Sequence, residues 1–321
     1  MIDRLRPMFL ASLVFAVACN GGDGGGGGDD DGVDVDAGNN PPAEGFRIQP
    51  SLITIQPGQE VTYCYYTTIN IPRTMGVKRW SSTMTPGSHH LILFFQNHGK
   101  PDGTVDQSCG GVSGGGITNL PVWSYSASQP VAEMVIPAGI GMQVNQGQQA
   151  YVQMHYLNTG DQPIEANVTI DAEAYAAGET FTPAAAFVTY NTNINIPAGG
   201  TGMAQGSCTI PAGTKFFTMS THAHKRATLT RVTDGNTMVF ESTNWEHPGG
   251  RTWDAAPFYA FSNQLTYRCE YDNRTGPTSG MPVGEGDSAA TDEMCMAVGY
   301  YFIEGATSAR SRFCLNSLLV P

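Results

Sequence analysis

The stretch Lys215-Phe216-Phe217-Thr218-Met219-Ser220-Thr221-His222-Ala223-His224 joins an apolar, β-prone run to a pair of histidines. In a β-strand, residues two apart point to the same face, so His222 and His224 would present two imidazoles side by side. One strand would then offer two ligands to a transition metal. Two exposed histidines also reach this spacing by chance, so a metal site needs support from elsewhere in the chain.

Short β-prone runs alternate with Gly/Pro-rich turns from Phe46 to the C-terminus, and long helical patterns are missing from the sequence. Regular short strands of this kind are typical of β-sandwiches and barrels. The segment is too long for one ordinary sandwich. We therefore expect an all-β chain with two tandem antiparallel, jelly-roll-like β-sandwich domains, at 46–177 and 178–321. The strand pattern lapses at this boundary, near Ala176-Ala177-Gly178.

The N-terminus has the features of a secretory signal. Two arginines precede a short apolar run that ends at Ala16-Val17-Ala18-Cys19, so residues 1–19 are predicted to be a signal peptide. The small residues before Cys19 are typical of a bacterial lipoprotein signal, in which this cysteine is lipidated. An ordinary signal peptidase site is the alternative. Residues 20–45 are rich in Gly and Asp, and we expect a flexible acidic tether because they cannot bury enough apolar surface to fold.

The net charge and the cysteine count indicate which partners and which cellular compartment to expect. The formal net charge is −12 and Lys and Arg do not cluster, so a nucleic-acid partner is not expected. Contact with a membrane is expected only through a lipid anchor on Cys19. With that cysteine assigned to the signal, an even number remains, and in an exported chain this indicates three disulfides whose pairing the residues alone leave open. We expect an exported monomer, either a bacterial cell-envelope lipoprotein facing the periplasm or cell surface, or a secreted protein.

Three further stretches carry side chains that bind metals. His89 and His90 precede an apolar run, and adjacent strand residues bind one metal only at a strand end or a bulge. The turn Thr85-Pro86-Gly87 supplies such an end. His155 lies within a β-prone run, where a lone histidine is more often a hydrogen-bonded core residue. Met294 belongs to a chain with 13 methionines, any one of which is more often a packing residue.

Together these stretches resemble the copper type II, ascorbate-dependent monooxygenases, the family of peptidylglycine α-hydroxylating monooxygenase and dopamine β-monooxygenase. That family has, in order, a His-His pair before a strand, a Gln-x-His-Tyr, a His-x-His and an Asp/Glu-Glu-Met-Cys. The matching stretches here are His89-His90, Gln153-Met154-His155-Tyr156, His222-Ala223-His224 and Asp292-Glu293-Met294-Cys295. The likeness covers roughly Phe46 to the C-terminus, and it includes a similar cysteine-containing segment that starts at Cys269.

The resemblance implies two copper ions per chain. His89, His90 and His155 would hold the first, which serves as an electron reservoir. His222, His224 and Met294 would form the catalytic site around the second, where oxygen binds and the substrate is hydroxylated. The ligand chemistry agrees, because imidazole suits both copper oxidation states and a soft thioether favours Cu(I). The resemblance also implies the disulfides Cys64–Cys109, Cys208–Cys314 and Cys269–Cys295.

The chain departs from the family at positions that contact the substrate. Ser220 stands where the amidating enzyme has an arginine that anchors a peptide carboxylate, and Met296 and Val298 stand where it has Asn and Tyr. These departures argue against a peptide C-terminus as substrate and favour a less polar molecule. Lys225 and Arg226 could bind an anion, although a solvated loop is the more common arrangement.

The sequence therefore predicts an exported copper monooxygenase that hydroxylates an aliphatic C–H of a small molecule with O2 and an external reductant. Ascorbate is the family's donor, and a substitute is expected if the source is bacterial. The alternative is a copper-sequestering surface lipoprotein without catalytic activity, which would use the same ligands. A surface β-sandwich with vestigial sites is disfavoured, because all six ligand positions are filled.

Overall fold

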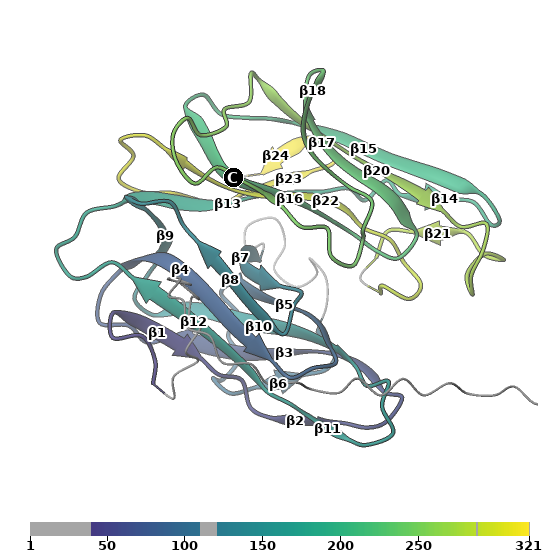
Figure 1. Cartoon of the computed structure of the whole chain (residues 1–321), viewed down its shortest axis with the longest axis horizontal. Helices are drawn as coiled ribbons and strands as arrows, with labels where there is room; N and C mark the ends of the chain where they lie inside the picture. Colours follow the sequence, from purple (N-terminus) through teal and green to yellow (C-terminus); the bar gives the residue numbers. More distant parts are fainter. Residues whose placement is uncertain (1–39, 110–120, 287, 321) are drawn as a thin grey trace, which may run out of the picture. The chain divides into compact units, whose positions relative to one another are not determined.

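The computed structural model describes residues 40–109, 121–286 and 288–320, apart from the side chain of His89. The predicted signal peptide with Cys19, and the predicted tether up to residue 39, lie outside the described residues. The described residues belong to one compact unit built from β-strands and turns (Figure 1). Within this described part, no helix is long and apolar enough to cross a membrane. The prediction of an all-β fold is confirmed.

Strands β1 to β12 form the N-terminal half of the fold. Their bounds are β1 Gly45–Ile48, β2 Ile53–Ile55, β3 Glu60–Ile69, β4 Met75–Met84, β5 Ser88–Phe95, β6 Val105–Asp106, β7 Val122–Ala127, β8 Val131–Val135, β9 Ile140–Val144, β10 Gln148–Leu157, β11 Ile164–Ala166 and β12 Val168–Ala174.

Strands β13 to β24 form the C-terminal half. Their bounds are β13 Thr182–Tyr190, β14 Asn195–Ile196, β15 Thr201–Thr209, β16 Thr214–Ala223, β17 Ala227–Asp234, β18 Thr237–Ser242, β19 Arg251–Thr252, β20 Gln264–Asp272, β21 Val283–Gly284, β22 Cys295–Ile303, β23 Arg312–Leu315 and β24 Leu318–Val320.

The first sandwich pairs the sheet β6-β3-β10-β5-β7 with a second layer that contains β1, β12, β4, β8 and β9. Residues alternate across the sheet, as expected for strands with one apolar and one more polar face. In β10, for example, Val152, Met154 and Tyr156 are buried in the first core. The residues between them, including Gln153 and His155, lie on the opposite face. This alternation decides which side chains of β10 reach the site described below.

The second sandwich stacks the sheet β15-β20-β17-β18 on strands β13, β22 and β16 (Figure 1). Those three strands are in turn continuous with the second layer of the first sandwich, because β13 runs parallel to β9. Among the described strands, β13 also runs parallel to β23, and the other strand pairs are antiparallel. The predicted boundary between 177 and 178 falls in the turn between β12 and β13, and the division into two domains stays a prediction.

The central strands β13 and β22 are buried on both faces. In β13, Ala186 and Val188 belong to the first core, whereas Phe187 between them belongs to the second. In β22, Val298 and Tyr301 likewise belong to different cores. A strand with two buried faces is apolar nearly throughout, which explains why these segments lack a polar alternation.

Three disulfides link the chain, between Cys64 and Cys109, Cys208 and Cys314, and Cys269 and Cys295. Their Cα–Cα distances are 5.9, 6.2 and 5.7 Å, within the ordinary range for a bridged pair. These are the pairs that the family resemblance implied, so the prediction of the pairing is confirmed. Cross-links of this kind are typical of a protein that folds in an oxidising compartment outside the cytosol.

Candidate metal centre

One cavity of about 400 Å³ collects most of the predicted metal ligands. Five of the six predicted ligands line it: His90, His155, His222, His224 and Met294. The sixth predicted ligand, His89, has a side chain that lies outside the described residues. The cavity therefore brings together residues that are as much as 204 positions apart, from Met294 back to His90.

The imidazoles form a continuous series across the cavity. The ring centroids of His90 and His155 are 5.3 Å apart, and those of His222 and His224 are 5.4 Å apart. The two pairs also meet, because His90 and His222 are 6.3 Å apart by the same measure. The indole of Trp123 packs beside the two pairs, with 6.0 Å between its ring centroid and that of His222. The two ligand sets predicted from the sequence thus share one cavity.

Other metal-binding geometries find no support among the described residues. Within that part of the chain, no group of three His, Cys, Asp or Glu side chains is arranged to hold a metal ion. Neither predicted ligand set contains three described His, Cys, Asp or Glu side chains, and the reason differs between the two sets. The first needs His89, whose side chain is not described, and the second uses the thioether of Met294.

The first set is positioned by the pairing of β5 with β10. His90 lies opposite His155, and Ser88 lies opposite Tyr156, so His89 is an extra residue in the ladder. A two-against-one register of this kind is a β-bulge, which turns successive side chains away from strict alternation. The backbone irregularity that adjacent histidine ligands require is therefore present at this pair.

His155 is buried, with 7% of its surface exposed, and its Nε2 lies 2.7 Å from Oε1 of Glu60. The sequence left open whether this histidine is a hydrogen-bonded core residue or a ligand. It is buried and hydrogen-bonded, but it lies on the face of β10 that lines the cavity. Gln153 lines the cavity from the same face, two residues earlier.

The second set begins where β16 ends. His222 pairs with Met296 of β22, and His224 follows one residue after the strand. Nδ1 of His224 lies 3.1 Å from the carbonyl oxygen of Asp292, so this nitrogen carries the proton and donates. The lone pair that a metal needs is then on Nε2. Burial lowers the pKa of His224 from 6.5 to about 4, which keeps the imidazole neutral at physiological pH.

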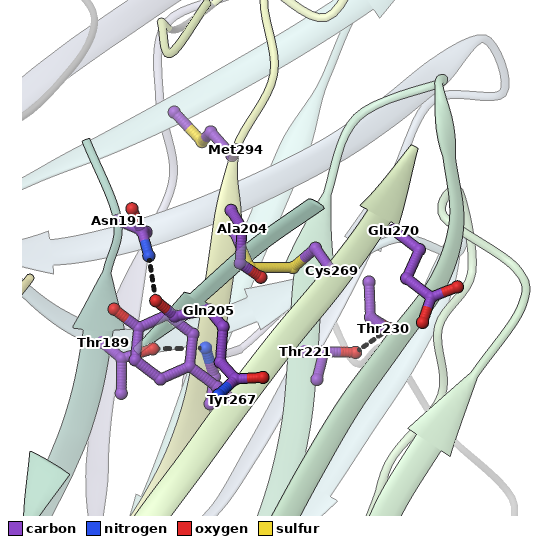
Figure 2. The surroundings of a disulfide bond; sticks show 12 residues. Thr189, Asn191, Ala204, Gln205, Thr221, Thr230, Tyr267, Cys269, Glu270 and Met294 are labelled. Atoms are coloured by element: carbon purple, nitrogen blue, oxygen red, sulfur yellow. Dashed lines mark hydrogen bonds between the residues drawn. A yellow bond between two sulfur atoms is a disulfide. The ribbon is translucent and has the colours of Figure 1, made fainter. Parts of the chain in front are cut away.

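Met294 is the residue directly before β22, and its backbone is held on both sides. The hydroxyl of Tyr271 donates to the Met294 carbonyl oxygen at 2.8 Å, and the next residue, Cys295, is bridged to Cys269. In Figure 2 the Met294 side chain extends away from this disulfide. A flexible thioether is thereby carried on a fixed backbone, as a ligand position requires.

A buried ion pair joins the two segments that carry His224 and Met294. The carboxylate of Glu293 is fully buried and accepts the backbone N–H groups of His224, at 3.0 Å, and Arg226, at 2.8 Å. The guanidinium of Arg226 lies 3.4 Å from the same carboxylate. Burial raises the pKa of Glu293, and the two N–H donors and the guanidinium oppose that rise.

Sequence reasoning missed this pair. Arg226 is only 5% exposed, so its assignment to a solvated loop is wrong, whereas Lys225 is exposed. The guanidinium also donates to the carbonyl oxygen of Ala290 at 2.7 Å and to the hydroxyl of Thr278 at 2.7 Å. The available signal was an arginine two residues after His-x-His and a glutamate directly before the methionine.

A second cavity, of about 360 Å³, adjoins the first. His90, Trp123, His222 and His224 line both cavities. The positions at which the chain departs from the family lie on these walls. Met296 lines the first cavity, and Ser220 and Val298 line the second.

Among the described residues that line the two cavities there is no lysine or arginine. A carboxylate in either cavity would therefore lack a cationic side chain to pair with, and an unpaired charge is costly to bury. The lining favours ligands that carry no negative charge.

The donor set fits copper. Neutral imidazoles are ligands for both Cu(I) and Cu(II), and a thioether is a soft ligand that selects Cu(I). The hydrogen bond from His224 to Asp292 fixes the tautomer of a ligand histidine in the way that outer partners in metal sites commonly do. These residues could hold copper without a change of protonation at His224.

Comparisons with known proteins do not assign the chain to a family. No protein-family model matches it, and no curated protein matches it. Among solved structures, the major capsid protein P2 from bacteriophage PM2 aligns with a TM-score of 0.30 and 8% identity, over 82% of this chain and 99% of that chain. PBCV-1 VP54, fitted into a reconstruction of the virophage Sputnik, aligns with a TM-score of 0.26 and 6% identity, over 81% and 95%. Likenesses this low carry no argument about function.

Proposed function

We propose that this protein is an exported dicopper monooxygenase that hydroxylates an aliphatic C–H bond of a small molecule. The observation that carries the proposal is the single cavity lined by His90, His155, His222, His224 and Met294. The sequence motifs predict these same residues as ligands, and histidines placed at random on the surface would not be expected to converge in one cavity. The disulfide pairing, which the same resemblance implied, is further support.

The proposed reaction consumes one O2 and two electrons for each substrate. One oxygen atom enters the C–H bond to give an alcohol, and the other leaves as water with two protons. Bound copper would supply electron transfer and oxygen activation. An external two-electron donor is required, either ascorbate or a substitute.

The chain itself would hold the ligands, orient them and exclude water. His224 keeps Nδ1 on the Asp292 carbonyl and so offers Nε2 to a metal. The Glu293 carboxylate fixes the spacing between the His224 and Met294 segments. The proposed mechanism uses no side chain as a general acid or base.

The substrate is proposed to be a small molecule with an apolar, uncharged body. Apolar and aromatic side chains dominate the wall of the first cavity. Those that surround the ligand residues are Ile92, Phe94, Trp123, Tyr151, Val188, Tyr190, Met296 and Phe313. A wall of this kind stabilises a bound molecule mainly by removing apolar surface from water.

We also propose that the protein is anchored to the cell envelope through lipidated Cys19 and acts as a monomer. The disulfides support export, and the sequence around Cys19 supports the anchor. Mass spectrometry of the mature protein decides this point. A lipidated cysteine at the N-terminus supports the anchor, and an unmodified N-terminus at another residue refutes it.

We expect purified protein to bind two copper ions per chain. Metal analysis after reconstitution with Cu(II) and removal of excess metal measures this number. His222→Ala and His90→Ala should each lower the stoichiometry by about one ion, because each removes a ligand of a different set. His247→Ala is the control, since His247 is exposed and lines neither cavity. A single copper in the unchanged protein, or zinc at full occupancy, would contradict the proposal.

Oxygen consumption separates catalysis from storage. The copper-loaded protein should consume O2 with a reductant and a panel of neutral apolar C–H compounds, and mass spectrometry should show a product heavier by one oxygen atom. Charged carboxylate analogues of the same compounds are the matched controls and should react more slowly. Two bound coppers with no hydroxylated product across the panel would favour the copper-sequestering lipoprotein instead.

A further inference from the structure

Glu60 is the first residue of β3, and its position relative to His155 follows from strand pairing. In the β3–β10 ladder, Thr62 lies directly opposite His155, and Glu60 lies opposite Leu157. Residues two apart on a strand share a face, so Glu60 is the diagonal neighbour of His155, within reach of a long side chain. Both Glu60 and Thr62 line the first cavity beside His155.

The contact between the two side chains is a hydrogen bond of 2.7 Å, from Nε2 of His155 to Oε1 of Glu60. An ionised carboxylate has no proton to give, so the imidazole must donate from Nε2. A neutral imidazole that is protonated at Nε2 carries its lone pair on Nδ1. The carboxylate therefore selects one of the two tautomers that His155 could otherwise adopt.

The environment of this pair is uneven. The His155 side chain is 9% exposed, whereas that of Glu60 is 47% exposed. A side-chain hydrogen bond contributes about 1 kcal/mol to the stability of a fold, and less where one partner is half exposed to water. The contact therefore contributes little to the stability of the fold. Variants at Glu60 should stay folded, so the effect of the carboxylate on the histidine can be measured directly.

We propose that Glu60 is a positioning residue that fixes the ring orientation and the tautomer of His155, so that Nδ1 is the nitrogen presented to the metal. The inference rests on the proposed function for the identity of the metal. Outer partners of ligand histidines typically raise metal affinity or activity by about 10- to 100-fold.

The first test needs no metal. In metal-free protein with ¹⁵N-labelled histidine, NMR should show His155 protonated at Nε2, with its signal assigned by loss in a His155→Asn variant. Glu60→Ala should shift the signal toward a mixture of tautomers. Glu60→Gln should restore it, because the amide oxygen still accepts a hydrogen bond from Nε2.

The second test uses copper. We expect Glu60→Ala to weaken the binding of one of the two coppers by about 10- to 100-fold and to change the electron paramagnetic resonance spectrum of that ion alone. Glu60→Gln should bind nearly as the unchanged protein does. Glu165→Ala is the control, because Glu165 accepts a hydrogen bond from Thr54 at 2.6 Å and lines neither cavity.

The outcomes distinguish the two proposals. An Nε2–H tautomer that depends on Glu60, in a protein that binds no copper, upholds the positioning role and refutes the proposed function. Normal copper binding in Glu60→Ala with an unchanged tautomer overturns the positioning role and leaves the proposed function standing. Failure of Glu60→Gln to do better than Glu60→Ala on both measurements also overturns it.

Discussion

Replacing Met294 by alanine is expected to remove nearly all hydroxylation while copper remains bound at His90 and His155. Met294 supplies the only thioether in the proposed ligand sets, and a thioether favours Cu(I). Loss of an outer partner commonly costs about 10- to 100-fold in activity, so loss of a ligand itself should cost at least about 100-fold. The fall should appear in kcat, because the first ligand set and the other residues that line the cavity are unchanged.

The measurements are turnover, copper stoichiometry and Cu(I) affinity on the same preparation. Met294→Leu keeps most of the side-chain volume and removes only the sulfur, so it should fold normally and be as inactive as the alanine variant. Met281→Ala is the matched control, because Met281 is 55% exposed and outside both cavities. Retained turnover in Met294→Leu would show that the thioether is not a ligand.

Replacing Glu293 by alanine is expected to lower the free energy of unfolding by about 3–5 kcal/mol. The variant leaves the Arg226 guanidinium buried without its carboxylate, although the Arg226 side chain keeps its bonds to Thr278 and Ala290. It also removes the acceptor of the His224 backbone N–H. The guanidinium and the backbone N–H are both buried, and a buried polar group that loses its partner lowers the stability of the fold.

Urea unfolding monitored by fluorescence measures this change. Glu270→Ala is the matched control, since Glu270 pairs with Arg268 at 2.7 Å but both side chains are well exposed, and the cost should be below about 1 kcal/mol. A double variant, Glu293→Leu with Arg226→Met, should recover part of the loss, because no charge is then left unpaired. Equal costs for Glu293→Ala and Glu270→Ala would show that the buried pair does not stabilise the fold.

The sequence predicted the local features well because they depend on near neighbours. Alternating runs such as Val152 to Tyr156 predict strands, and the placement of His222 and His224 at the end of one strand follows from spacing. The pairing of six cysteines came only with the family resemblance, since spacing alone permits many connectivities. The convergence of the ligands in one cavity was beyond any local pattern.

What the sequence could not predict depends on distant partners. Arg226 follows Lys225 in what looks like a charged loop, and only the approach of Glu293 from 67 positions away explains its burial. Glu60 gives no signal by itself, because its role depends on the register between β3 and β10. Strands with two buried faces, such as β22, have no alternation from which to assign a side chain to one core.

The double burial of β13 and β22 has a mechanical consequence for the cavity. The side chains of Val188 and Met296 line the cavity and also belong to the first core. Moving His222 away from His90 would therefore expose apolar core surface to water, at roughly 25 cal/mol for each Å². Both sandwiches pack against these two strands. The cavity can therefore widen only if core packing is also lost.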